Sequence, residues 1–322
     1  MNLAKKNISV FCKSKVRKYF RLNNLKKYSW VIVRTVLIVG ISYIILSPLL
    51  TKIAGSFMTE RDVWSASVRW IPEDFTFDNY RDVFQRMLYP EAFLNSFILT
   101  SITSILQLAS CTFIGYGFAR FDFKGKKLFF AMVIFTLLVP PHVTMIPQYL
   151  NFRYFNFFGL IQEPGINMVG SYWPFILISL TGAGMRNGIF IYMMRQFFKG
   201  MPKSLEEAAY VDGAGPIKTF YNVMLPGAVP ALVTVFLFAF VWQWNDYFYT
   251  SMFMRSGTLL PMTLAFLNAG KFGSENLTTS GRVITHIYNN TGMLMFIAPL
   301  LILYAFMQRY FVESIERTGI VG

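Results

Sequence analysis

Between two long apolar segments of this 322-residue chain lies the polar stretch SLEEAAYVDGAGPIKTFYNVMLP, residues 204–226. Its spacing predicts a helix, a glycine turn and a second helix. Ser204 and Glu207 have the spacing of a capping box, in which each side chain satisfies a free amide of the first helical turn. Gly213 can adopt the left-handed conformation that ends a helix. Pro216 fits the first turn of the second helix.

The first of these two helices is expected to present a small and largely apolar face. Residues at positions i, i+3, i+4 and i+7 share one face of a helix. Here they are Leu205, Ala208, Ala209 and Asp212. Two alanines leave a flat surface that can enter a groove of a partner. The alternative is a plain helical hairpin in which Glu207 only caps its helix, but the joint spacing of the Glu-Ala-Ala run, Gly213 and Leu225-Pro226 favours docking.

Composition places most of the chain in a membrane. Hydrophobic residues make up 54% of it and charged residues 14%, whereas soluble domains are about a quarter charged. Six stretches are long and apolar enough to cross a hydrocarbon core as helices: 31–56, 92–119, 128–150, 168–194, 220–245 and 291–311. In lipid the backbone must satisfy its own hydrogen bonds, and no series of alternating strands indicates a barrel. We therefore expect an all-α polytopic membrane protein.

Charge predicts the orientation of these helices. Residues 1–30 contain nine Lys or Arg and no acidic residue, whereas the 60–91 segment contains seven Asp or Glu. By the positive-inside rule, both termini and the 204–226 stretch face the cytoplasm. Attraction to anionic lipid also accounts for the basic terminus, so nucleic-acid binding is disfavoured. The first apolar stretch is too long for a secretory signal and no small-x-small cleavage motif follows, so we expect it to be retained.

The chain divides into a short tail and one membrane domain. The expected parts are a basic cytoplasmic tail at 1–30 and a six-helix domain at 31–322, which contains a cytoplasmic loop at about 199–226, a long polar outer loop at about 254–290 and a cytoplasmic tail at about 312–322. Pro140-Pro141 and Pro147 are expected to end or kink the third stretch. Gly182, Gly184 and Gly188 predict a close helix contact or a break in the fourth.

Catalytic chemistry has no candidate in this sequence. No Gly-x4-Gly-Lys-Ser/Thr motif occurs, so we expect no ATP hydrolysis by this chain itself. Cys12 and Cys111 make neither a disulfide framework nor a metal site, and His142 and His286 lack metal-ligand neighbours. We expect no catalytic residue, metal or cofactor in the chain. An ion-coupled transporter needs charged relays at mid-membrane and usually an inverted repeat, and the sequence offers neither.

The 204–226 stretch resembles the cytoplasmic coupling loop, or EAA loop, of permease subunits in binding-protein-dependent ABC importers. Val223 stands where that pattern usually has Ile. The resemblance covers about residues 30–322 and is closest to the carbohydrate-uptake branch, in particular to the second permease subunit of maltose-type importers. Outside the loop it rests on Trp70-Ile71-Pro72, Phe77-x-Asn79-Tyr80, residues 193–198, Pro202, Trp244-Asn245-Asp246, and the tail segments 308–312 and 319–322, with Val321 where the branch often has Lys.

This resemblance implies the type I importer fold in a bacterial cytoplasmic membrane, with six crossings and both termini inside. It implies a second permease subunit in a heterodimer, two ATPase subunits that bind ATP and Mg, and an extracellular solute-binding protein that delivers an oligosaccharide. It also implies that the ATPase is contacted by Ser204, Leu205, Glu206, Glu207, Ala208, Ala209, Asp212, Gly213, Leu225 and Pro226. A permease for amino acids, peptides or ions is the alternative, and the Trp244-Asn245-Asp246 and tail patterns argue against it.

Sugar contacts have candidates in two aromatic clusters. Sugar rings are recognised by aromatic stacking and bidentate polar side chains, an inventory that matches Tyr172, Trp173, Trp242, Gln243, Trp244, Asn245, Asp246 and Tyr247. An interfacial aromatic belt with ordinary packing explains the same residues. A carboxylate near membrane depth is a functional candidate, but Asp246 can equally be a cap or form a salt bridge to a partner. In maltose-type relatives the membrane sugar site lies mainly in the partner permease.

Overall fold

The computed structural model describes residues 22–65, 67–254, 258–268 and 279–319. It divides into two compact units, Met1–Phe75 and Thr76–Gly322. The described residues form helices, joined by turns, and a single isolated antiparallel bridge between Phe155 and Ile166. The all-α prediction is therefore confirmed for the described part of the chain.

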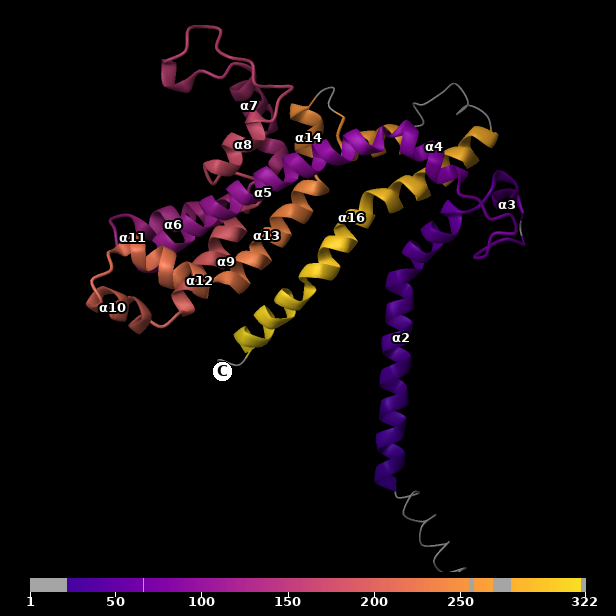
Figure 1. The fold of residues 1–322 in the computed structure, drawn as a ribbon, viewed down its shortest axis with the longest axis horizontal. Coiled ribbons are helices and arrows are strands. Elements are labelled where there is room, and N and C mark those ends of the chain that lie inside the picture. Colours follow the sequence, from indigo (N-terminus) through magenta and orange to yellow (C-terminus); the bar gives the residue numbers. More distant parts are fainter. Residues whose placement is uncertain (1–21, 66, 255–257, 269–278, 320–322) are drawn as a thin grey trace, which may run out of the picture. The chain divides into compact units, whose positions relative to one another are not determined.

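The first unit is dominated by one long apolar helix, α2 (Leu22–Ser56), which is drawn in indigo in Figure 1. Side chains such as Val36, Ile44 and Ile45 are more than half exposed within the unit. An apolar helix with so little protein packing needs an apolar medium around it. The α2 helix extends nine residues ahead of the predicted 31–56 span, because the basic residues before the span also favour helix.

A short helix, α3 (Glu60–Trp64), follows α2 and is ordered by Asp62. The carboxylate of Asp62 accepts the Thr59 amide at 3.1 Å, and the Thr59 hydroxyl accepts the Asp62 amide at 3.4 Å. The other carboxylate oxygen accepts the amides of Glu73 and Asp74 at 3.3 and 3.4 Å. One acidic side chain thus fixes both the start of α3 and the loop after it.

The second unit contains the remaining helices. In chain order they are α4 (Asp78–Arg86), α5 (Tyr89–Arg120), α6 (Lys126–Thr136), α7 (Pro141–Arg153), the 3₁₀ turn η1 (Phe157–Gly159), α8 (Trp173–Leu180), α9 (Asn187–Gly200), α10 (Ser204–Val211), α11 (Pro216–Thr219), the π-helical turn η2 (Phe220–Met224), α12 (Leu225–Gly227), α13 (Val229–Trp244), α14 (Phe248–Phe253), α15 (Leu260–Asn268) and α16 (Thr279–Gly319).

Helix α5 is the axis of this unit. It packs against α8, α9 and α13, and α16 packs along α13 and α15 (Figure 1). The closest approach is at Gly115, where a β-carbon would lie 2.6 Å from Cβ of Met194 and 3.0 Å from the backbone nitrogen of Arg195. The absence of a side chain at Gly115 therefore allows α5 and α9 to pack with their backbones close together.

Three described helices are long and apolar enough to cross a membrane: Lys27–Ser56, Tyr89–Arg120 and Arg282–Gln308. Two bent helix pairs raise the number to five. The third predicted stretch bends by 100° between α6 and α7, at the expected Pro140-Pro141. The fifth bends by 76° between α12 and α13. Within a bent pair, the two arms together have the length and composition of one crossing.

The fourth predicted stretch, 168–194, is not one helix. It contains α8 and the beginning of α9, separated by residues 181–186. Gly182 has φ 72° and Arg186 has φ 58°, and left-handed residues interrupt an α-helix. The glycines were expected to make either a break or a close helix contact, and the structure shows both. Gly182 lies in the break, whereas Gly188 lies against α6, where a β-carbon would come within 2.8 Å of the Val133 carbonyl oxygen.

The predicted outer loop at 254–290 contains helices in its described part. It contains α15, and α16 begins at Thr279, ahead of the predicted last span at 291–311. Leu259, Leu260 and Leu267 are buried, so apolar residues fold this segment onto the unit although its overall composition is polar. At the other end α16 continues to Gly319, and the predicted tail at 312–322 is thus helical over its described part.

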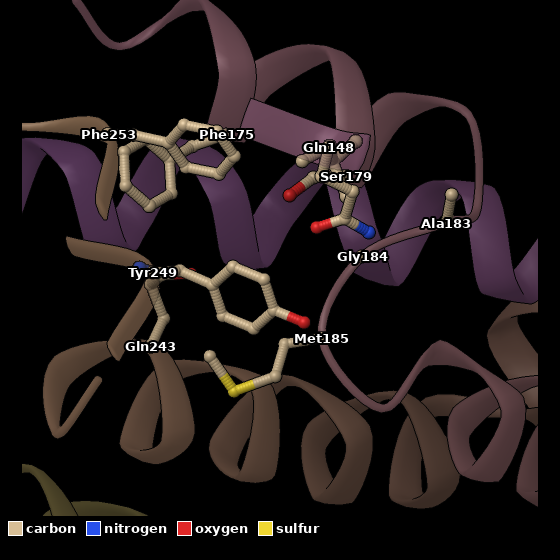
Figure 2. A pocket seen from close by; sticks show the side chains of 10 residues that line it. Gln148, Phe175, Ser179, Ala183, Gly184, Met185, Gln243, Tyr249 and Phe253 are labelled. Carbon is tan, nitrogen blue, oxygen red and sulfur yellow. The ribbon is translucent and has the colours of Figure 1, made fainter. Parts of the chain in front are cut away.

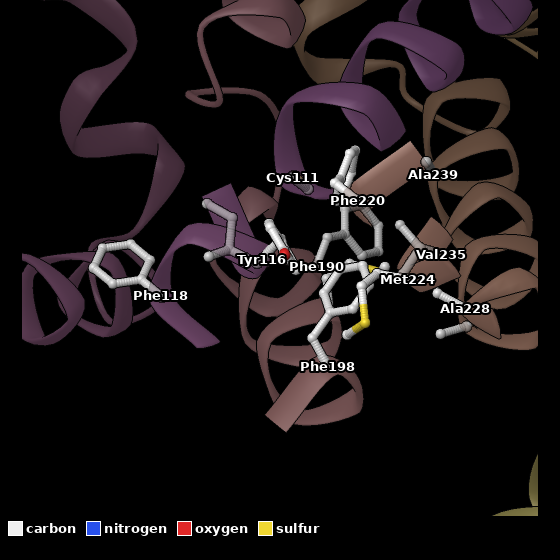
Figure 3. Close-up of a cluster of buried hydrophobic side chains, with 13 residues drawn as sticks. Cys111, Tyr116, Phe118, Phe190, Phe198, Phe220, Met224, Ala228, Val235 and Ala239 are labelled. Atoms are coloured by element: carbon white, nitrogen blue, oxygen red, sulfur yellow. The ribbon is translucent and has the colours of Figure 1, made fainter. Parts of the chain in front are cut away.

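The main core of the unit lies between α5, α9, η2 and α13. It is built from aromatic, methionine and small side chains that include Cys111, Tyr116, Phe190, Met194, Phe198, Phe220 and Met224 (Figure 3). Cys111 is fully buried there, as expected for a structural cysteine, while Cys12 lies outside the described residues. The two helices that flank residues 204–226 therefore share one core.

Two glycines on α5 give a matched test of the α5–α9 contact. We predict that Gly115→Ala destabilises the chain by about 1–3 kcal/mol, because the new methyl overlaps backbone atoms that cannot move independently. Gly117→Ala should be neutral or slightly stabilising, since a β-carbon at that position would have no neighbour within 4 Å. Thermal unfolding followed by size-exclusion chromatography in detergent measures both. Equal melting temperatures for the two variants would contradict this packing.

Candidate functional site

Residues 204–226 fold as predicted into a helix, a glycine turn and a second helix. Helix α10 ends at Asp212, which is its C-cap, and Gly213 follows with φ 78°. The amide of Gly213 donates to the Tyr210 carbonyl at 3.0 Å, and the amide of Ala214 donates to the Ala209 carbonyl at 2.9 Å. These bonds satisfy the last carbonyls of the helix. Gly213 therefore makes the sharp turn that separates α10 from α11.

The predicted capping box is wrong. Lys203, not Ser204, is the N-cap of α10, and no side chain caps this end. The amides of Glu206 and Glu207 both donate to the Lys203 carbonyl, at 3.0 and 3.1 Å. The helix thus starts at Ser204, one residue earlier than predicted. Glu206 is buried because it pairs with Arg120, which is distant in sequence, and Glu207 is exposed.

Glu206 is the buried anchor of the loop. One carboxylate oxygen accepts the Tyr116 hydroxyl at 2.8 Å, and the other forms an ion pair with Arg120 Nε at 3.3 Å. Arg120 also donates from Nη2 to the Met201 carbonyl at 2.8 Å. The two charged side chains are only 6% and 10% exposed. The end of α5 is thereby tied to both the end of α9 and the start of α10.

The second half of the loop is tied to the core by packing. In η2, Phe220 and Met224 are buried, and the Phe220 ring lies 4.7 Å from the ring of Tyr116. Tyr116 also meets Phe198 edge-on at 5.2 Å. The same tyrosine thus joins α10 through its hydroxyl and η2 through its ring. The η2 segment is a π-helical turn, and such turns are frequently found at functional sites.

The outward face of the loop is unusually apolar. Leu205 is 42% exposed, Val211 is 87% exposed and Ile217 is 75% exposed. Ala208, Glu207 and Asp212 are exposed beside them, whereas Ala209 from the predicted face is buried. Leu225 is half-buried and Pro226 exposed at the end of the loop. Several exposed apolar residues within a short polar segment are a candidate for a surface that a partner covers.

The residues predicted to contact sugar do not form one site. Trp244 is buried, and its indole donates to the Phe296 carbonyl at 3.1 Å. Asp246, just past the fifth stretch, accepts the amides of Tyr249 and Thr250 at 3.2 and 2.9 Å. Burial raises the pKa of the Asp246 carboxyl, while these hydrogen bonds lower it. The Trp244 and Asp246 side chains thus serve packing and the start of α14.

Two of the predicted residues lie at a different place from Trp244. Gln243 lines a cavity of about 30 Å³ between α7, α8 and α14 (Figure 2). Trp242 stacks on Phe190, with ring centroids 5.1 Å apart. The other predicted residues do not line the cavity: Tyr172 is partly buried in a neighbouring cluster, and Trp173, Asn245 and Tyr247 are exposed. A cavity of this size has room for water, not for a sugar ring.

Apolar helices that need lipid, joined by a folded polar loop, define a polytopic membrane protein. A family model described as the binding-protein-dependent transport system inner membrane component matches residues 111–317. The chain belongs to this family of ABC importer permeases, whose members are membrane subunits and not themselves ATPases.

The relatives of the chain include permeases named for the transport of oligosaccharides. It is 28% identical to the arabinooligosaccharides transport system permease protein AraQ of Halalkalibacterium halodurans, over 91% of this chain and 97% of the relative. It is 29% identical to the melibiose/raffinose/stachyose import permease protein MelC of Bacillus subtilis, over 80% and 85%. Its fold matches a solved bacterial ABC transporter involved in the import of the acidic polysaccharide alginate, with TM-score 0.70, 24% identity, and coverage of 89% and 98%.

The Glu206 anchor makes a prediction that distinguishes two adjacent glutamates. Glu206→Ala should destabilise the chain by about 3–5 kcal/mol, because it leaves the buried guanidinium of Arg120 unpaired. Glu207→Ala should leave stability nearly unchanged, because Glu207 is exposed. Thermal unfolding in detergent compares the two variants. Similar melting temperatures for Glu206→Ala and the unmodified chain would rule out a structural role for this ion pair.

Proposed function

We propose that this chain forms half of the translocation path of an ATP-driven oligosaccharide importer and couples that path to ATPase subunits through residues 204–226. The observation that carries this proposal is the exposed apolar face of α10 and α11 on a loop whose other side is anchored by Glu206. Membership of the permease family supports the same role.

The proposed topology has six crossings with both termini in the cytoplasm. The nine basic residues at 1–30 and the acidic 60–91 segment support this orientation. Helices α2, α5 and α16 supply three crossings, and the two bent pairs supply two more. The sixth is the broken segment formed by α8 and α9. On this topology the loop between α9 and α13 lies in the cytoplasm of a bacterial cell, and residues 254–290 lie on the outer side, near the binding protein.

The proposed assembly contains a second permease in a heterodimer, two ATPase subunits that bind ATP and Mg, and an extracellular solute-binding protein. The cavity lined by Gln148 and Gln243 is too small for an oligosaccharide, which supports a path completed by a second permease. The apolar faces that the chain exposes away from the loop suit lipid or that second permease. In this arrangement Glu207, Ala208 and Gly213 contact the ATPase.

Coupling in this proposal uses contacts that differ between two states of the importer. When the ATPase subunits close on ATP, α10 moves with them. The Glu206–Arg120 ion pair passes this motion to α5, and the Phe220–Tyr116 packing passes it to η2 and α13. The two permeases then alternate between inward-open and outward-open forms. A loop that bound the ATPase equally well in both states would not change the equilibrium between the inward-open and outward-open forms.

Charge reversal at an exposed position tests the docking surface. Glu207→Lys should abolish sugar uptake and weaken binding of the ATPase, while the chain still inserts and folds, because Glu207 makes no buried contact. Uptake by membrane vesicles and co-purification of the ATPase measure this outcome. Glu163→Lys on the loop before α8 is a matched control, being exposed but far from the coupling loop in sequence. Normal sugar-stimulated ATP turnover by the Glu207→Lys importer would refute the assignment.

The division of labour between subunits gives a second test. The purified chain alone should not hydrolyse ATP, because its sequence contains no phosphate-binding loop. Adding its ATPase partner should restore turnover. A colorimetric phosphate assay on both preparations measures this, and a sustained rate from the chain free of other subunits would contradict the proposal.

A further inference from the structure

The break between α8 and α9 carries an exposed arginine in an unusual backbone conformation. Arg186 is the N-cap of α9 and has φ 58°. Few residues other than glycine adopt the left-handed region, and those that do so are often held there by their surroundings for a functional reason. The side chain of Arg186 is exposed, at the end of the break that follows the strongly apolar helix α8. Ionisable groups in such places are candidates for function.

The core holds this conformation from both sides. Gln107 on α5 is buried, and its amide nitrogen donates to the Met185 carbonyl at 2.6 Å and to the side-chain oxygen of Asn187. Met185 and Asn187 are the two neighbours of Arg186 in the chain. Because one buried side chain binds both neighbours, the position of Arg186 is determined by the core of the unit and not by a loose loop.

The guanidinium of Arg186 is oriented by an aromatic ring. Its Cζ lies 4.5 Å from the ring centroid of Trp242, and Trp242 is itself stacked on buried Phe190. A guanidinium stacked on a ring keeps its in-plane N–H groups available for a carboxylate. Within the part of the chain that the structure describes, Arg186 takes part in neither of the ion pairs Arg120–Glu206 and Lys126–Asp122. None of the described carboxylates therefore pairs with Arg186.

The small cavity of Figure 2 is lined in part by the break that contains Arg186. Gly184 and Met185, from the same break, line the cavity together with Gln243, the neighbour of Trp242. Two buried amide atoms of the lining residues, Gln148 Oε1 and Gln243 Nε2, have no hydrogen-bond partner within the described residues. One is an acceptor and the other a donor, and a hydroxyl group can satisfy both at once. A single hydroxyl also fits the size of the cavity.

We propose that Arg186 binds the carboxylate of an acidic sugar during transport, while the Gln148 and Gln243 amides receive a neighbouring hydroxyl. The inference rests on the proposed role of the chain in oligosaccharide import and narrows the substrate class to uronate-containing oligosaccharides. Arginine binds a planar carboxylate through two parallel hydrogen bonds, and the stacking on Trp242 presents it for that geometry.

The experiment compares two probes with the same sugar backbone, one with charged and one with neutral carboxyl groups, with the complete importer in proteoliposomes. The probes are a short oligogalacturonate and the same oligomer with its carboxylates methyl-esterified. Arg186→Gln should lower uptake of the acidic probe about tenfold or more and change uptake of the ester less than about twofold. Arg186→Lys should keep part of the acidic uptake, because lysine keeps the charge without the planar fork. Arg153→Gln, another exposed arginine, is the control and should change neither.

The ratio of acidic-probe uptake to ester uptake reports recognition of the carboxylate. The basal ATP turnover of each preparation shows whether the importer is folded and assembled. If Arg186→Gln lowers uptake of both probes equally, or lowers neither, the assignment is overturned. It is also overturned if the wild-type importer takes up only the neutral probe or neutral oligosaccharides. If the wild type transports only the acidic probe, the decisive comparison is its uptake by Arg186→Gln against Arg153→Gln. Uptake of any oligosaccharide that is unchanged when this chain is omitted instead contradicts the proposed function itself.

Discussion

The buried contact among Glu206, Arg120 and Tyr116 is the constraint on which the rest of the account depends. Separating a buried ion pair costs much free energy, because each charge is then left buried without its partner and without water. It therefore holds α10 in a fixed position on α5, and the ring of Tyr116 extends that fixed position to η2. An anchored loop of this kind can pass force to α5, as the proposed coupling role requires. With its inner side anchored, the loop presents its apolar side outward as a formed surface.

Local sequence rules predicted the backbone of this loop well. Gly213 takes the left-handed conformation because its residue type allows it at low cost, and Pro216 starts α11 for a similarly local reason. The capping box failed because its pattern is local and its competitor is not. Arg120 is distant in sequence, and only the tertiary fold brings it to Glu206. The sequence contained a hint, since Arg120 ends an apolar stretch on the basic side, but nothing in it indicated which of two adjacent glutamates faces inward.

In the membrane part, composition predicted which segments are helical, but not where they break or where their side chains point. Apolar content predicted the helices, and Gly182 indicated a possible break, but the break at 181–186 also depends on Arg186, a residue whose type gives no sign of a left-handed turn. The aromatic inventory around residues 242–247 likewise identified suitable side chains without their directions. Trp244 points into the core with Phe296, whereas the preceding two residues reach Arg186 and the small cavity. Adjacent positions on a helix face different neighbours, and only packing decides which of them can meet a substrate.

The central claim is that a separate ATPase covers the outward face of α10, and the accessibility of Ala208 measures this most directly. A cysteine introduced at this exposed position, with Cys12 replaced by serine and Cys111 already buried, can be labelled by a maleimide in the permease pair with and without its ATPase subunits. The account predicts rapid labelling without them and strong protection in the full importer. Labelling at the same rate in both preparations would show that the loop is not the docking surface.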